Sequence, residues 1–95
     1  MGLSAALKEQ IAFAGGKVET ENFDSYPLLR MSETPEIEIH IVESHDKLGG
    51  IGEPGVPPVA PAVGNAVFRA TGVRFRSLPM NPEVVLQALK TAGNR

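Results

Sequence analysis

Cysteine and tryptophan are absent from this 95-residue chain, and aromatic residues make up only 5% of it. Without cysteine there is no disulfide framework, no thiolate metal site and no cysteine nucleophile. The absence fits a reducing compartment. With so few aromatic side chains, and with much of its apolar content in alanine and valine, the chain has a thin core for a free-standing enzyme.

The chain also lacks a large excess of one charge, because it has nine lysines and arginines and eleven aspartates and glutamates. Nucleic acid is therefore not an expected partner, since it requires a clustered basic face. The apolar runs are too short to span a bilayer, and no basic segment followed by an apolar stretch opens the chain. We expect neither a transmembrane segment nor a signal peptide. Hydrophobic residues still make up 42% of the chain, which predicts one domain or a piece of one.

The first half of the chain combines helical and strand-like patterns. Residues 3–10 predict a short amphipathic helix. Residues 11–23 predict a hairpin, because apolar residues alternate on both sides of a Gly-Gly pair that supplies positive φ angles. A helix that runs on to Ala14 is the alternative. Residues 36–42, EIEIHIV, alternate isoleucine with polar side chains and predict a strand.

The second half predicts two helices around a further strand. Residues 58–72 carry a stripe of small residues that ends at a glycine, as a helix with a glycine C-terminus does. Residues 73–80 alternate like a strand, and Asn81 is a good N-cap for a helix that stops at Gly93. The predicted fold class is α+β, with short helices and a small mixed sheet. We expect loose loops at 24–35 and 43–58, and apolar surface left exposed.

Residues 49–58 read GGIGEPGVPP, in which Glu53 is the single charge. Gly52 and Gly55 leave room for a bulky ligand to approach the backbone, and Pro54 restricts the conformation of Glu53. A carboxylate held rigidly among apolar groups tends to have a raised pKa, which suits a general base. The same residues also make an ordinary surface turn with a solvated glutamate, so both interpretations stay open.

Two other groups of residues are candidate sites. A pair of histidines with acidic neighbours has no spacing typical of a metal site, so we expect exposed side chains and assign no metal ligand. Two arginines on one strand face would suit an anion, although a solvated face is the simpler interpretation. No P-loop, dinucleotide-binding or nucleophile-elbow motif occurs. The residues concerned are His40, Glu43, His45 and Asp46 in the first group, and Arg74 and Arg76 in the second.

The run GGIGEPGVPPVAPAVGNAVFRATGVRFRSLPM (49–80) closely resembles the C-terminal end of the molybdopterin-binding large subunit of the molybdenum hydroxylases, the xanthine dehydrogenase and aldehyde oxidase family. Within it, the chain is most similar to the isoquinoline 1-oxidoreductase beta subunit branch, also described as molybdopterin-binding aldehyde dehydrogenases. Residues 2–44 resemble the segment that precedes the glutamate there. The resemblance implies that residues 1–95 are the C-terminal part of a molybdopterin-binding domain, with its motif core at 49–80.

This resemblance also implies a role for the glutamate. Glu53 would be the base beside the molybdenum that deprotonates a molybdenum-bound hydroxyl, whose oxygen then attacks an electron-poor carbon of an aldehyde or N-heterocycle. Gly52 and Gly55 would flank the cofactor. The implied cofactor is molybdenum-molybdopterin, in its cytosine dinucleotide form, in the complete enzyme; none is expected for the isolated chain.

Large subunits of this family are several times longer than the chain, so most of the pterin contacts and the substrate pocket are expected elsewhere. One hypothesis is a part of an oxidoreductase, inactive alone, whose partners are the remainder of the large subunit, an iron–sulfur small subunit and a small-molecule substrate. The alternative is a small non-enzymatic α/β interaction module that docks on a partner subunit or self-associates. A ligand-binding loop at GIGEPG ranks third, because no second polar group converges on it. The resemblance leaves the substrate, and the choice between bacterial cytoplasm and periplasm, open.

Overall fold

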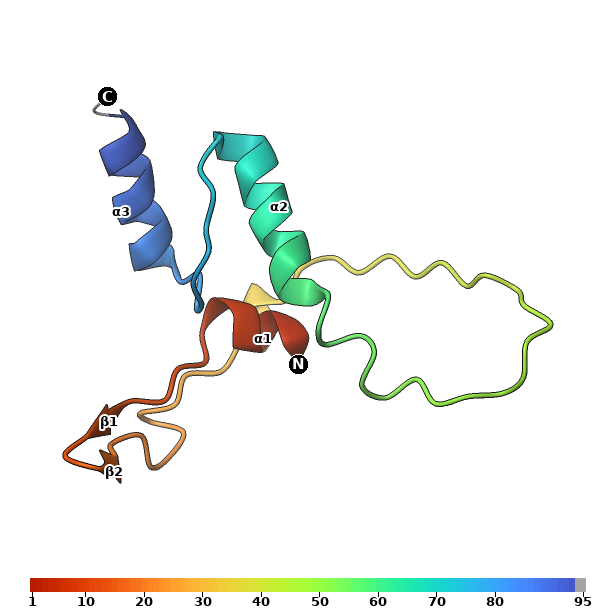
Figure 1. Cartoon of the computed structure of the whole chain (residues 1–95), viewed down its shortest axis with the longest axis horizontal. Coiled ribbons are helices and arrows are strands. Elements are labelled where there is room, and N and C mark those ends of the chain that lie inside the picture. Colours follow the sequence, from red (N-terminus) through yellow and green to blue (C-terminus); the bar gives the residue numbers. More distant parts are fainter. Residues whose placement is uncertain (94–95) are drawn as a thin grey trace.

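The computed structural model of the chain describes residues 1–93; the last two residues of the predicted 1–95 domain lie outside the described residues. Three short α-helices and one antiparallel strand pair make up the α+β fold that the sequence predicts (Figure 1). The elements in chain order are helix α1 (Gly2–Leu7), strands β1 (Phe13–Ala14) and β2 (Lys17–Val18), the 3-10 helix η1 (Met31–Glu33), and helices α2 (Val59–Thr71) and α3 (Pro82–Gly93).

Local capping residues determine where the two longer helices end or begin. Helix α2 stops at Gly72, which has a φ of 76° and whose amide donates a 2.7 Å hydrogen bond to the carbonyl of Phe68. Helix α3 follows Asn81, whose side-chain Oδ1 accepts a 2.9 Å hydrogen bond from the amide of Val84. The left-handed glycine and the asparagine N-cap are confirmed at these positions.

The Gly-Gly pair forms the predicted hairpin turn. Gly15 and Gly16 have φ angles of 57° and 76°, a left-handed pair that matches the twist of the flanking strands. Phe13 lies opposite Val18 in the antiparallel register. The alternative of a helix that runs on to Ala14 is therefore wrong.

The other two predicted strands, 36–42 and 73–80, do not form in the described part of the chain. Their alternating patterns are genuine, but a strand requires a neighbouring strand to accept and donate its backbone hydrogen bonds. In the described residues, strand pairing occurs between β1 and β2 alone, and neither 36–42 nor 73–80 makes a backbone hydrogen bond to another strand. The sheet of the described residues is thus one antiparallel pair.

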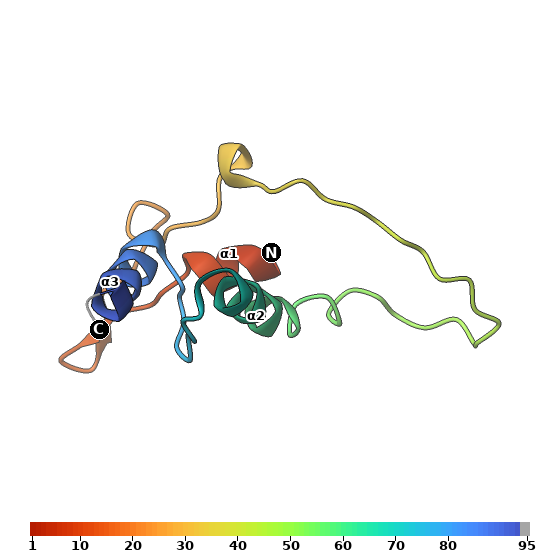
Figure 2. The same ribbon diagram turned by 90° about the horizontal axis from the view of Figure 1, so that it is seen from above.

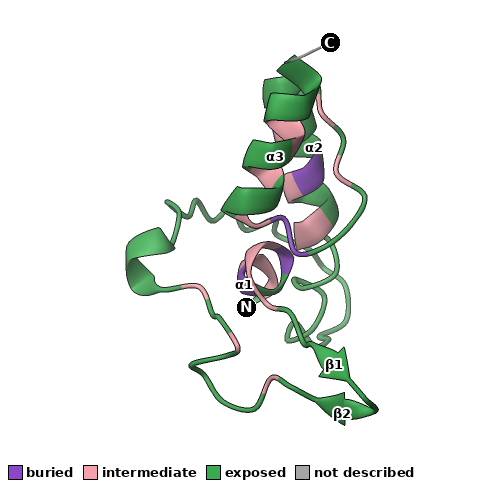
Figure 3. Ribbon diagram, turned by 90° about the vertical axis from the view of Figure 1, so that its left-hand side faces the viewer, coloured by how far each residue is buried: buried purple, intermediate pink, exposed green. Residues whose placement is uncertain are grey.

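A small core joins α1 to α2 and to the chain before α3. Ala6 is 1% exposed and Met80 is 4% exposed, and the amide of Met80 donates a 2.8 Å hydrogen bond to the carbonyl of Ala6. Pro79 and the α2 residue Gly64 are also buried. Figure 3 shows buried stretches on α1, on α2 and on the chain before α3. The nearest atom to a β-carbon on Gly64 would be the carbonyl oxygen of Phe75. The core is therefore small, and it joins three segments through a few buried residues.

The molecule is expanded for its length. Its radius of gyration is 16.8 Å, whereas a compact chain of this length has about 12 Å. It exposes 8427 Å² of surface, against about 5,300 Å² for a compact monomer of the same mass. Much of the difference lies in residues 35–58, which leave the helices as a long exposed loop (Figures 1 and 2). Within residues 1–93, no helix has both the length and the apolar character needed to cross a membrane.

Candidate functional site

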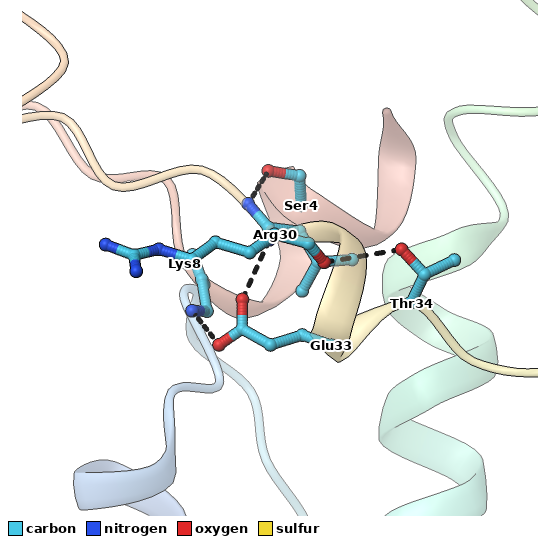
Figure 4. Close-up of polar contacts among 6 residues, drawn as sticks. Ser4, Lys8, Arg30, Glu33 and Thr34 are labelled. Atoms are coloured by element: carbon cyan, nitrogen blue, oxygen red, sulfur yellow. Dashed lines mark hydrogen bonds and ion pairs between the residues drawn. The ribbon is translucent and has the colours of Figure 1, made fainter.

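The loop at 35–58, which carries Glu53, is held at both ends by α1. At its entry, Lys8 and Glu33 form an ion pair, and Ser4 Oγ accepts a 3.0 Å hydrogen bond from the amide of Leu29 (Figure 4). The second Glu33 oxygen accepts a 2.8 Å hydrogen bond from the amide of Arg30. These contacts attach η1 and the chain before it to α1.

The exit of the loop is attached through close packing. A β-carbon added to Gly2 would lie 2.8 Å from Val59 Cγ2 and 3.3 Å from the carbonyl oxygen of Val56. Only glycine permits that approach without displacing α2. One short helix therefore determines where the Glu53 loop leaves the folded part of the chain and where it returns.

Glu53 opens a tight turn near the exit. Its carbonyl accepts a 2.9 Å hydrogen bond from the amide of Val56, across Pro54 and Gly55. Proline in the second position of such a turn presets φ and directs the chain. A β-carbon added to Gly52 or Gly55 would meet no atom within 4 Å, so the backbone on both sides of Glu53 is open. This openness leaves room for a large group to approach the turn.

The Glu53 side chain is exposed, as are all residues from 30 to 58. The sequence predicts a carboxylate held among apolar groups, for which Ile51 and Val56 are the nearest apolar residues in the chain. In the structure, however, Ile51 is 89% exposed and does not cover the carboxylate. Burial of Glu53 is therefore not supplied by the described residues, and a solvated turn describes this chain taken alone.

The two histidines are not brought together with the acids between them. His40 Nε2 lies 3.6 Å from Glu38 Oε2, and both side chains are more than 80% exposed. Ion pairs as exposed as this contribute little to stability. In the described part of the chain, no group of three or more histidine, cysteine, aspartate or glutamate side chains is placed to hold a metal ion.

Of the two arginines, Arg74 lies against α2. Its Nη1 donates a 2.7 Å hydrogen bond to Asn65 Oδ1, and its guanidinium carbon lies 4.0 Å from the centre of the Phe68 ring. These neutral partners position Arg74 as a contact between the predicted strand and α2. Both Arg74 and Arg76 are exposed. An open cleft of about 820 Å³ lies between residues 72–74 and α3, and neither Glu53 nor its flanking glycines line it.

A second polar contact near α1 has no local signal in the sequence. The hydroxyl of Tyr26 donates a 2.5 Å hydrogen bond to Glu9 Oε1, which lowers the pKa of Glu9 below its usual value and raises that of Tyr26. The ion pair with Lys8 likewise lowers the pKa of Glu33. Partners so far apart in sequence follow no short motif, and this region is covered only by the resemblance of residues 2–44.

Known proteins match the chain along nearly its whole length. It is 42% identical over 92 residues to the isoquinoline 1-oxidoreductase subunit beta of Brevundimonas diminuta, covering 97% of the chain and 12% of that protein. It is 43% identical over 89 residues to a membrane-bound aldehyde dehydrogenase of Gluconacetobacter polyoxogenes whose name specifies pyrroloquinoline quinone, covering 94% of the chain and 12% of that protein.

A third relative is the putative xanthine dehydrogenase molybdenum-binding subunit of Escherichia coli strain K12, 33% identical over 100 residues, covering 98% of the chain and 13% of that protein. No family model matches the chain. The chain is similar to one segment of proteins of the xanthine dehydrogenase and aldehyde oxidase family, among them an isoquinoline 1-oxidoreductase subunit beta and a xanthine dehydrogenase molybdenum-binding subunit. It spans 12–13% of the length of these three relatives.

Proposed function

We propose that the chain is part of a molybdenum-dependent oxidoreductase that hydroxylates aldehydes or N-heterocycles, and that Glu53 is its catalytic base. Residues 1–95 would be the C-terminal part of the molybdopterin-binding domain, with the motif core at 49–80. The observation that carries this proposal is the open Gly-Glu-Pro-Gly turn, set on an anchored loop in a chain that matches molybdenum-binding subunits.

The residues fit one side of such a site. Glu53 offers a proton acceptor with no competing side-chain partner in the described residues, and the backbone at Gly52 and Gly55 has room for the edge of a cofactor. The described chain supplies no cluster of metal-ligating side chains, so it would contribute a base while other segments hold the cofactor. The rest of the subunit would also supply the burial that raises the proton affinity of a carboxylate.

In the complete enzyme, Glu53 would accept a proton as the oxygen that attacks the substrate carbon becomes nucleophilic. Pro54 would keep the carboxylate directed, and the tight turn would limit its reorganisation during the step. When bound, molybdenum-molybdopterin would accept the electron pair that the substrate loses; we propose the cytosine dinucleotide form. An iron–sulfur small subunit would then take those electrons away.

The test is complementation. The full chain would be co-expressed with the Brevundimonas diminuta subunit lacking its matching segment, together with that enzyme's other subunits, in a host that makes the pterin cofactor. We expect oxidation of an aldehyde or isoquinoline with the wild-type chain. Glu53→Gln should reduce the rate about 10²- to 10⁴-fold at unchanged molybdenum content. Equal rates for the wild-type and Glu53→Gln chains would refute the assignment of Glu53 as the base.

The name of the Gluconacetobacter relative makes the cofactor itself a point to test. Metal analysis and quinone extraction of the complemented enzyme separate the two possibilities. Molybdenum without quinone supports the proposal, and quinone without molybdenum overturns it.

The second candidate function is a non-enzymatic interaction module. Its support is the exposed surface of 8427 Å², far above that of a compact monomer. This candidate predicts that the chain binds a partner subunit while no variant of Glu53 changes any activity of the complex.

A further inference from the structure

Residues 36–42 have the pattern of a strand but no partner. Ile37, Ile39 and Ile41 alternate with polar residues, so a strand here would place them on one face. They are 68%, 79% and 86% exposed. Among the described residues, no hydrogen bond involves a backbone amide or carbonyl of 36–42. Both the apolar face and both hydrogen-bonding edges of this segment are therefore free.

Three isoleucines left in water forgo the stabilisation that their burial would provide. Unpaired strand edges are templates for pairing with another chain, and alternating isoleucines gain stability only when one face is buried. Figures 1 and 2 show the segment extended away from the helices, where a second sheet has access to it. Pro35, which has no amide hydrogen, precedes the segment and marks an acceptable start for a strand.

We propose that residues 36–42 are a docking strand that inserts into a β-sheet of the remainder of a molybdenum-binding subunit, with the three isoleucines directed into that subunit's core. The inference rests on the proposed function, because the partner is the remainder of the subunit to which that function assigns the chain. Glu36, Glu38 and His40 would then line the opposite, polar face of the sheet.

A second copy of this chain fits less well. Pairing of two 36–42 segments would make a two-stranded ribbon, which uses one edge of each segment and leaves the isoleucine face uncovered. Two-stranded ribbons are marginal in water, and stability requires further strands or a packed face. Insertion between strands of a larger sheet satisfies both edges and covers the isoleucines at once. The chain matches only 12% of the Brevundimonas diminuta relative, and the unmatched part is long enough to contain such a sheet.

The first experiment measures capture. The tagged full chain is co-expressed with the Brevundimonas diminuta subunit lacking its matching segment, and the complex is isolated on the tag. Ile39→Lys places a charge on the face that is to be buried and should weaken capture roughly 100-fold. Glu38→Lys introduces the same side chain on the opposite face and should be captured within about threefold of wild type. Both positions are exposed in the isolated chain, so neither variant should change its circular dichroism.

The second experiment locates the contact by hydrogen exchange. The amides of 36–42 should exchange freely in the isolated chain and be strongly protected in the complex. Failure of the wild-type chain to be captured, equal loss for both lysine variants, or unprotected amides in the complex would each overturn the docking strand. A dimer of the isolated chain with the same amides protected would also overturn it and identify a second copy as the occupant.

The outcome is separable from that of the catalytic proposal. Glu53→Gln should be captured as well as wild type, since Glu53 lies outside the docking strand. Capture with no effect of Glu53→Gln on activity would remove the base and keep the strand. If activity depends on Glu53 but the 36–42 amides stay unprotected in the complex, the docking strand is refuted and the catalytic base is retained.

Discussion

Gly2 and Val59 lie in van der Waals contact at the crossing of α1 and α2, closer than any side chain at position 2 would permit. A β-carbon on Gly2 would lie 2.8 Å from Val59 Cγ2, a separation that forces something to shift. The contact fixes the exit of the Glu53 loop, so the fold and the candidate site depend on the same glycine.

Gly2→Val should therefore destabilise the chain by about 1–3 kcal/mol through overpacking. Urea denaturation followed by circular dichroism measures it. The control is Gly49→Val, in open space on the loop, which should stay within about 0.5 kcal/mol of wild type. Equal stabilities for the two variants would contradict the close approach of the helices.

The core prediction concerns two methionines of very different exposure. Met80 is 4% exposed and Met31 is 93% exposed. Met80→Ala should cost about 2–5 kcal/mol, which a small core cannot absorb without unfolding much of the helical structure. Met31→Ala should change stability by less than about 0.5 kcal/mol. Comparable melting temperatures for the two variants would show that Met80 is not part of the core.

The start of α3 depends on the Asn81 cap. Asn81→Ala removes the acceptor for the Val84 amide and should cost about 1 kcal/mol, read as lost helicity and a lower denaturation midpoint. Asn81→Asp keeps an acceptor and adds a charge that favours a helix N-terminus, so it should retain the wild-type midpoint. If the denaturation midpoint of Asn81→Asp falls as far as that of Asn81→Ala, the cap does not stabilise the helix.

Acid should weaken the attachment of the loop entry. The ion pair with Lys8 lowers the pKa of Glu33 from its usual 4.5, so the folded chain binds that proton less readily than the unfolded chain. The stabilisation is present above 4.5 and is lost as the pH falls through the lowered value. Denaturation midpoints between pH 7 and 3 should fall less in Glu33→Gln than in wild type, and Glu43→Gln, outside the ion pair, should follow wild type. Parallel curves for Glu33→Gln and wild type would rule out this contribution.

Trypsin should report the exposed loop. Lys47 lies where no described backbone hydrogen bond protects the chain, whereas Arg69 lies within α2. Cleavage after Lys47 should therefore come first, because proteases act on segments that are locally open. The two products should co-elute, since α1 lies on one of them and α2 on the other. First cleavage after Arg69 would mean that α2 opens more readily than the loop.

The helices, their caps and the hairpin were predictable because each is specified locally. Gly72, Asn81 and the Gly-Gly pair act through their own backbone conformation or through residues three or four positions away. The strands at 36–42 and 73–80 were not realised, since pairing depends on a neighbour that sequence periodicity cannot supply. The polar contacts around α1 escaped prediction for the related reason that Lys8 and Glu33 are distant in sequence.

For the candidate site, the sequence indicated the Glu53 turn and its two open glycines, and the structure has both. The sequence also suggested an enclosed carboxylate, which depends on atoms that the described residues do not provide. The exclusion of His40 and His45 from a metal site remains a prediction from their spacing.

Since α1 holds both the entry and the exit of residues 35–58, the segment is a closed loop in the sense of polymer physics. The free energy of closing such a loop grows only with the logarithm of its length, so doubling it would add about 0.6 kcal/mol. Insertions between 43 and 50 should therefore leave the anchors intact while moving Glu53 relative to the docking strand. Because α1 anchors both ends of the loop, the number of residues between the docking strand and Glu53 can change without disturbing the fold.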